Sequence, residues 1–285
     1  RRAAPPMLLP LLLLLLTLPA SAARAQQGPS PTPTPTPPAA SLERRFLKNV
    51  LRDQKAIWTS PLRLRGDDAK WLVPLTLATA GLVSTDRRVA GSLDDSGAQV
   101  RAGEAVSKLG SFYTAAGVSA AFYVAGRYKG NARARETGVL GAEALVNAVI
   151  VHSVLKAATQ RERPLEGDRR GRFFEGGTSF PSAHSVHAWT IATVVARQYS
   201  DRRAVRLGAY GLAAAASLAR VAARKHFPSD VLVGGAIGYG IGRYVHRASK
   251  AGAAGGGEPS PLFPQIAPAV DRRSGAYGVR LTWGF

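Results

Sequence analysis

Residues 156–164, 181–184 and 220–230 read Lys-Ala-Ala-Thr-Gln-Arg-Glu-Arg-Pro, Pro-Ser-Ala-His and Arg-Val-Ala-Ala-Arg-Lys-His-Phe-Pro-Ser-Asp. The positions that matter in these segments supply three cationic groups, a hydroxyl, two imidazoles and a carboxylate, and they are Lys156, Arg163, Arg220, Ser182, His184, His226 and Asp230. Such a set can bind a phosphate-like anion and act on it without a metal ion. These segments therefore predict one composite site, and the rest of the chain is interpreted around them.

The basic side chains of the first and third segments suit the oxygens of a phosphate. Arg163 and Arg220 can contact two oxygens at once, and Lys156 acts as a point charge. All three are therefore predicted to neutralise the non-bridging oxygens.

The second segment has the composition of a helix start. Pro181 suits the first position of a helix, which would direct the backbone N–H groups of Ser182 and Ala183 at an anion. The Ser182 hydroxyl is expected to point the same way.

Three further side chains supply acid–base and nucleophilic chemistry. His226 with Asp230 has the pattern of an activated nucleophile whose carboxylate partner fixes the imidazole tautomer. His184 is then free to protonate a leaving oxygen.

Composition favours an anionic partner. The chain has 285 residues, room for one domain of about 200 residues with tails. Lys plus Arg is 38 against 18 Asp plus Glu, a net charge of +20, which suits phosphorylated substrates or anionic lipid headgroups. No aromatic-interleaved basic helix supports a nucleic-acid partner. The absence of cysteine excludes disulfides and thiolate metal sites.

Residues 1–25 have the pattern of a secretory signal peptide. A basic start, an apolar run from Met7 to Leu18 and small residues before Gln26 predict export to the periplasm or cell envelope, with cleavage before Gln26. The alternative is a retained membrane anchor.

Four further parts follow along the chain. Residues 26–40 form a Pro/Thr-rich linker expected to be disordered, and residues 41–68 an amphipathic helix with a connector. Residues 69–248 are predicted to be the helical domain that contains the three motifs, between 156 and 230. Residues 249–285 are predicted to be a Gly/Pro linker and a tail.

Six helical runs are predicted within the helical domain, because each is long, rich in alanine and bounded by charged or glycine-rich loops. They span residues 69–85, 104–127, 136–160, 182–199, 203–222 and 229–247. Glycines at 234, 238 and 242 predict a close helix–helix approach. No uncharged stretch reaches the roughly 20 residues of a membrane span. A periplasmic bundle, soluble or resting on a membrane surface, is therefore favoured.

Near the C-terminus the apolar residues recur at every second position, as in a strand, instead of at helical spacing. Tyr277, Val279, Leu281, Trp283 and Phe285 alternate with small or polar residues, which predicts a strand. With residues 265–270 it forms a predicted β-hairpin, and packing on the bundle is favoured over a role as an outer-membrane barrel strand.

Taken together, Lys-x6-Arg-Pro, Pro-Ser-x-His and Arg-x5-His-x3-Asp resemble the type 2 phosphatidic acid phosphatase family, which includes class A acid phosphatases and vanadium haloperoxidases. The resemblance covers residues 136–247. Two positions depart from the family pattern: Ala183 replaces its usual glycine, and Ala219 replaces the serine before Arg220. The resemblance implies an all-α six-helix bundle, here with a possible C-terminal β-hairpin.

The resemblance also implies a mechanism. His226 would attack phosphorus and form a phosphohistidine, Asp230 would orient its ring, and His184 would protonate the leaving group and then activate water. The phosphate would be held by Lys156, Arg163, Ser182, Ala183 and Arg220. No metal and no cofactor would be required.

The leading hypothesis is a cell-envelope phosphatase acting on a phosphate monoester or a (pyro)phosphorylated lipid. Its partner would be a phosphorylated small molecule or a lipid headgroup, with a membrane surface also considered. One alternative is a vanadate-dependent haloperoxidase, for which vanadate would be the cofactor instead of an inhibitor. Another is a non-catalytic envelope protein. The arginines between the first two motifs, Arg161, Arg169, Arg170 and Arg172, are expected to be mostly solvated, and His187 is a candidate for lining the pocket.

Overall fold

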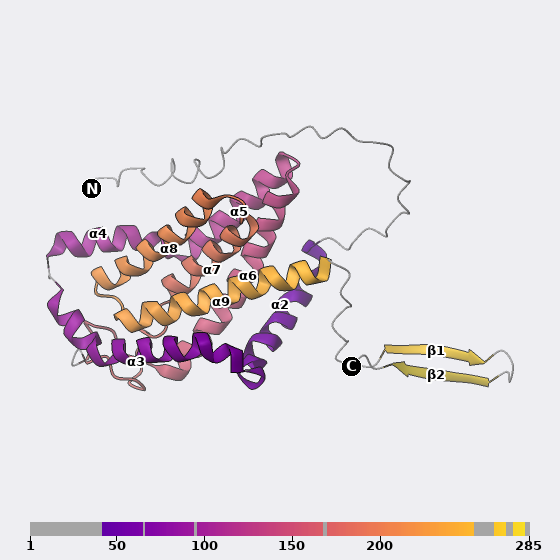
Figure 1. Cartoon of the computed structure of the whole chain (residues 1–285), viewed down its shortest axis with the longest axis horizontal. Coiled ribbons are helices and arrows are strands. Elements are labelled where there is room, and N and C mark those ends of the chain that lie inside the picture. The colour runs from indigo at the N-terminus through magenta and orange to yellow at the C-terminus, as the bar shows by residue number, and fades with distance from the viewer. Residues whose placement is uncertain are drawn as a thin grey trace. The chain divides into compact units, whose positions relative to one another are not determined.

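The computed structural model describes residues 42–64, 66–93, 96–167, 170–253, 265–271 and 276–282. The predicted signal peptide and Pro/Thr-rich linker lie outside these ranges. The chain divides into two compact units, Arg1–His246 and Arg247–Phe285. The fold is all-α with a terminal strand pair (Figure 1), which confirms the predicted class.

The first described elements are helix α2 (Leu42–Thr59), the 3₁₀ turns Ser60–Arg63 and Gly66–Asp68, and helix α3 (Ala69–Ser92). Helix α2 packs on α6 (Ala132–Thr159), the long helix that contains the first motif lysine. Helix α3 continues past its predicted end at residue 85. It does so because Asp86, the first charged residue after a long uncharged run, is buried and has partners inside the protein.

The predicted helix 104–127 is wrong. The chain forms α4 (Gly97–Ser107), a 3₁₀ turn (Lys108–Gly110) and α5 (Phe112–Tyr128) instead. Ser111 separates them, because its hydroxyl accepts a hydrogen bond from the backbone N–H of Thr114 at 3.1 Å and so caps α5. The bundle therefore has one helix more than predicted in this region.

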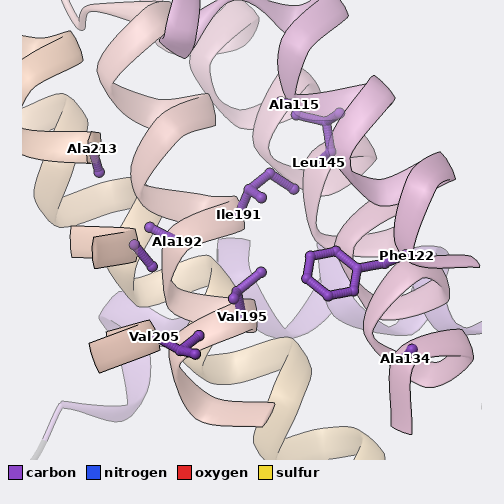
Figure 2. Close-up of a cluster of buried hydrophobic side chains, with 10 residues drawn as sticks. Ala115, Phe122, Ala134, Leu145, Ile191, Ala192, Val195, Val205 and Ala213 are labelled. Carbon is purple, nitrogen blue, oxygen red and sulfur yellow. The ribbon is translucent and has the colours of Figure 1, made fainter. Parts of the chain in front are cut away.

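The remaining four helices correspond to predicted ones, although the first begins four residues earlier and the last ends six residues later than predicted. They are α6, α7 (Ala183–Gln198), α8 (Arg203–Ala222) and α9 (Pro228–Ala253). Helix α7 lies between α6 and α8 and contacts both. Figure 2 shows its inner face, where Ile191 and Val195 lie opposite Leu145 and Phe122 in the larger buried cluster.

The glycines of α9 bring it close to α7, as their spacing predicts. A Cβ atom at Gly238 would lie 2.3 Å from the carbonyl oxygen of Val186, a distance that no side chain tolerates. This close approach holds the start of α9 against the start of α7, and two of the three motifs lie at these helix starts.

Helix α6 is the one candidate membrane span found among the described residues, by length and hydropathy. Its most apolar window is 61% buried inside the protein. A core helix of a soluble protein has the same properties, so this observation alone places no helix in a membrane.

The C-terminal unit contains the predicted hairpin. Strand β1 (Gln265–Asp271) pairs antiparallel with β2 (Ala276–Thr282), and Ile266 lies opposite Leu281. The period-two pattern of this segment therefore corresponds to a real strand pair.

Candidate active site

Two of the three predicted phosphate-binding cations meet at one residue. Lys156 lies in the last turn of α6, and its Nζ donates to the backbone carbonyl of Thr178. Arg163, just beyond the helix end, donates from Nη2 to the Thr178 hydroxyl at 3.0 Å. The chain reverses between them at Gln160, whose φ of 45° ends α6 in the left-handed conformation. The first motif is therefore folded around Thr178.

The second motif differs from its prediction. Helix α7 begins at Ala183 with Ser182 as the N-cap, so Pro181 precedes the helix and does not occupy its first position. The Ser182 N–H donates to the Asp230 carbonyl oxygen at 3.1 Å, so it is not directed at an anion. The Ala183 N–H belongs to the first helical turn, where N–H groups lack a partner within the helix.

The third motif connects α8 to α9. Arg220 lies in the last turn of α8, and Asp230 in the first turn of α9. Asp230 Oδ2 accepts hydrogen bonds from the Ser179 hydroxyl at 2.5 Å and from the Phe227 N–H at 2.9 Å. It also lies 3.6 Å from Nδ1 of His226. This arrangement leaves Nε2 of His226 on the side of the ring away from the carboxylate.

The segment before α7 joins the three motifs. Thr178 contacts Lys156 and Arg163, and the next residue, Ser179, contacts Asp230 and lies 3.5 Å from His226 Nδ1. Motif residues far apart in sequence are thus brought to one short stretch of chain.

Three buried polar atoms of the predicted phosphate-binding residues have no hydrogen-bond partner in the described part of the chain. They are Nε of Arg163, Nε of Arg220 and the hydroxyl of Ser182. Buried polar atoms are nearly always hydrogen-bonded. Guanidinium N–H groups and a hydroxyl are donors of the kind that bind the oxygens of a phosphate.

The electrostatics of the site keep its histidines neutral. Burial lowers the pKa of His184 to about 4, and the positive charge of Arg220 adds to this effect, with smaller contributions from His226 and Lys156. Burial also lowers the pKa of His226 to about 4, although Asp230 works in the opposite direction. His184 lies in the first turn of α7, two residues after the N-cap Ser182.

The pKa of Lys156, at the end of α6, is also lowered. Burial and the neighbouring Arg163 lower the pKa of Lys156 to about 8. For Asp230, burial works to raise the pKa, but the adjacent His226 and the charge of Arg161 outweigh it, so the pKa is lowered. Asp230 is therefore an anion, and the site around it is rich in positive charge that a bound anion would offset.

A second pair of histidines lies next to the site. The Nε2 atoms of His152 and His187 are 3.0 Å apart, and both side chains are buried. Burial lowers the pKa of His187 to about 3, and the charges of His152 and His184 contribute. A structural role is the favoured interpretation of His187 and pocket lining the alternative, and the choice between them stays a prediction.

Arg161 was expected to be solvated, and this prediction is wrong. Its side chain is 2% exposed and forms ion pairs with Asp86 and Asp230. Sequence reasoning also missed Thr178 and Ser179, although their position directly before the second motif could have indicated them. No comparable signal marks Asp86, which lies in a different helix far upstream.

No group of three or more His, Cys, Asp or Glu side chains that could hold a metal ion occurs within the described ranges. The expectation of metal-independent chemistry stays a prediction.

Comparison with known proteins gives one family and two solved structures. Residues 138–252 match the PAP2 superfamily. A transmembrane PAP2-type phosphatidylglycerolphosphate phosphatase from Bacillus subtilis is 20% identical, with a TM-score of 0.49, over 62% of this chain and 95% of that one. LpxE of Aquifex aeolicus is 21% identical, with a TM-score of 0.41, over 57% of this chain and 93% of that one. No curated protein matches the sequence.

Proposed function

We propose that this chain is a metal-independent phosphatase of a phosphate monoester or a (pyro)phosphorylated lipid, because residues 138–252 match the PAP2 superfamily. The observation that best supports the proposal is a set of buried polar atoms that make no hydrogen bond in the described part of the chain. They are Nε of Arg163, Nε of Arg220 and the Ser182 hydroxyl, and the same three motifs supply His226, whose Nδ1 lies 3.6 Å from Asp230.

In the first step, Nε2 of His226 attacks phosphorus. The N–P bond forms as the bond from phosphorus to the leaving oxygen breaks, and the bonding electrons stay with that oxygen. His184 gives it a proton. Asp230 holds Nδ1–H and stabilises the positive charge that develops on the ring.

In the second step, His184 takes a proton from water, and the water oxygen attacks phosphorus. The O–P bond forms, the N–P bond breaks, and His226 returns to its neutral state. Lys156, Arg163 and Arg220 stabilise the charge on the phosphoryl oxygens throughout. A bound phosphate also raises the pKa of His184, since it offsets the positive charges that lower it.

We further propose that the reaction takes place at a lipid surface of the cell envelope. The outer helix α3 exposes large apolar side chains, with Trp71 80% and Leu77 68% exposed. The sequence has a net charge of +20, which attracts anionic headgroups. Export rests on the predicted signal peptide and stays a prediction.

The experiment is a phosphoenzyme assay with the purified protein. Phosphatidic acid, an isoprenoid pyrophosphate and an aryl phosphate, each labelled on phosphorus, are tested with rapid quenching. We expect turnover with at least one of them and an acid-labile phosphoenzyme, both of which are lost in His226→Ala. The matched control is His246→Ala, which changes a histidine 16 residues beyond Asp230 on the same helix.

Two additions separate the phosphatase from its alternatives. Vanadate should inhibit competitively, because its trigonal bipyramid resembles the transferring phosphoryl group, and EDTA should have little effect. Halide oxidation by the vanadate-loaded protein at rates above its phosphate hydrolysis would favour the peroxidase. A phosphoenzyme that persists in His226→Ala would overturn the assigned nucleophile.

A further inference from the structure

We propose that Arg161 and Asp86 are positioning residues for the active site. Asp86 holds the Arg161 guanidinium, and Arg161 holds Asp230 so that its second oxygen faces His226. The inference rests on the proposed function, and it adds a helix that lies outside the family match, since Asp86 belongs to α3.

The contacts form a continuous chain from α3 to the site. Arg161 Nη2 donates to Asp86 Oδ2 at 2.8 Å, and Nη1 donates to Asp230 Oδ1 at 2.7 Å. Ser229 links the same groups: its N–H donates to Asp86 Oδ1 at 3.1 Å, its hydroxyl donates to Asp86 Oδ2, and its oxygen accepts from Arg161 at 2.7 Å. One guanidinium therefore joins two carboxylates, and a serine links to both it and Asp86.

Arg161 has little freedom to move. Its guanidinium lies over the rings of Phe173 and Phe227, 4.7 Å and 4.4 Å from their centroids. Its Nε donates to the Gly171 carbonyl at 3.0 Å. Gly171 has a φ of +65°, and a Cβ there would lie 2.3 Å from the Phe227 ring, so this loop fits closely around the cation. A side chain that served only solubility would not be enclosed in this way.

The two oxygens of Asp230 have separate partners. Oδ1 accepts from Arg161, while Oδ2 accepts from Ser179 and the Phe227 N–H and lies 3.6 Å from His226. A carboxylate held at both oxygens cannot rotate freely. Arg161, together with Ser179 and the Phe227 N–H, therefore fixes which oxygen faces the imidazole.

The network also sets the charge that His226 experiences. The carboxylates of Asp86 and Asp230 and the guanidinium of Arg161 together have one net negative charge. Of the two carboxylates, Asp230 is the one nearer to His226. The other charged groups that act on His226 are Arg220 and Lys156, both cationic, and its titratable neighbour is His184. Removing Asp86 would leave Arg161 to neutralise Asp230, whereas removing Arg161 would leave two carboxylates without a cation.

The two removals should thus change His226 in opposite directions. In a plot of kcat/KM against pH, activity should fall on the acidic limb, the low-pH side, where His226 becomes protonated. In Arg161→Gln this limb should move to higher pH, because an unneutralised anion favours the imidazolium. In Asp86→Asn the limb should move to lower pH. Both should lower kcat by about 10- to 100-fold, by analogy with groups that orient the ligands of a catalytic metal. KM should change little, because neither residue touches substrate.

Asp53→Asn is the matched control. Asp53 is also a fully buried aspartate paired with an arginine, Arg52, at 2.8 Å, but it lies on α2 in contact with the middle of α6. It should destabilise the protein without moving the acidic limb. If Arg161→Gln does not fold, Arg161→Lys can be tested instead. Lysine keeps the positive charge but lacks the planar guanidinium that bonds both carboxylates. The acidic limb should therefore stay at the same pH while kcat falls.

Several results would overturn the inference. One is an acidic limb that stays in place, or moves in the same direction, in Arg161→Gln and Asp86→Asn. Another is a kcat in Arg161→Lys equal to that of the wild-type protein. If the wild-type protein hydrolyses none of the substrates, the proposed function fails, and NMR titration of the His226 imidazole in the same variants still decides the positioning role. Opposite shifts of the His226 pKa would support it, and equal pKa values would reject it.

Discussion

At the scale of single residues, the site combines neutral histidines with concentrated positive charge. His184 and His226 both have a pKa lowered to about 4, first by burial and then by neighbouring cations. A general acid that is mostly deprotonated at neutral pH works better as the pH falls. In the proposed mechanism His184 is this acid and His226 is the nucleophile, which no longer reacts once it is protonated, so the two effects limit activity from opposite sides of the pH range.

The first prediction follows from this balance. Hydrolysis of an alkyl phosphate should increase as the pH falls from 7 toward the pKa of His184, and should decrease again when His226 becomes protonated. His184→Ala should slow alkyl esters by about 100- to 10,000-fold and should remove the increase toward acid. An aryl phosphate should be affected much less, because its leaving group needs no proton. Equal losses for both substrates, measured by initial rates across pH, would contradict the role of His184.

Most of the proposed site could be predicted from spacing alone. Lys156, His184 and His226 were identified because their chemistry and order fit one phosphate. Arg161 and Asp86 could not be identified in this way. An arginine in a loop and an aspartate after an apolar helix look like solvated charges until their 2.8 Å contact is known.

At the scale of elements, the fold was predictable where each helix end coincides with a change in composition. Helix α8 begins and ends at its predicted residues, 203 and 222, because charged or loop residues flank its alanine-rich run. The split at residues 108–111 was missed because a single serine cap interrupts an apolar, small-residue run. Capping is decided by one hydroxyl and leaves little trace in the average composition.

The contact between α7 and α9 gives a second prediction. Gly238→Ala should lower the free energy of unfolding by about 1 to 3 kcal/mol, because the new methyl group would overlap the Val186 carbonyl. Gly240→Ala, where a Cβ meets nothing within 4 Å, should instead stabilise α9 by about 0.5 to 1 kcal/mol. Urea denaturation of both variants measures the difference. Destabilisation of similar size in both would show that the packing argument is wrong.

The contact between α2 and α6 gives a third prediction. Burial raises the pKa of Glu143 to about 8, and its neighbour Asp53 adds to the effect, although a hydrogen bond from Asn49 opposes it. The folded protein therefore keeps a proton that the unfolded chain releases above about pH 4.5. Stability from this group is complete below that pH and is lost as the pH rises toward 8.

Thermal melting at several pH values tests this. Glu143→Gln should raise the melting temperature at pH 8 relative to wild type by about 3 °C or more and flatten its pH dependence. Glu104→Gln, at a half-exposed glutamate paired with Lys225, is the control and should leave that dependence unchanged. An unchanged slope in Glu143→Gln would mean that the carboxyl is ionised in the folded protein at neutral pH.

At the scale of the whole molecule, surface composition predicts vesicle binding. Helix α3 lies along the edge of the helical unit (Figure 1) and exposes Trp71 and Leu77. Sedimentation with vesicles rich in anionic lipid should pellet the protein. The double substitution Trp71→Ser and Leu77→Ser should weaken binding by at least about tenfold, from the lost burial of two large apolar groups.

The control for this measurement is Leu207→Ser, which changes a 75% exposed leucine on α8. It should leave binding nearly unchanged if α3 is the face that meets lipid. Equal loss in both proteins would show that the apolar surface acts without a preferred face.

The ion network of Arg161 also determines how the chain can be divided. The family match begins at residue 138, yet Asp86, which neutralises the buried guanidinium, lies well upstream. A fragment cut at the edges of the match would leave Arg161 enclosed by two phenylalanine rings, with one of its two anionic partners removed. The smallest piece able to fold and work must therefore begin no later than α3, and a boundary drawn by similarity alone would cut through the functional unit.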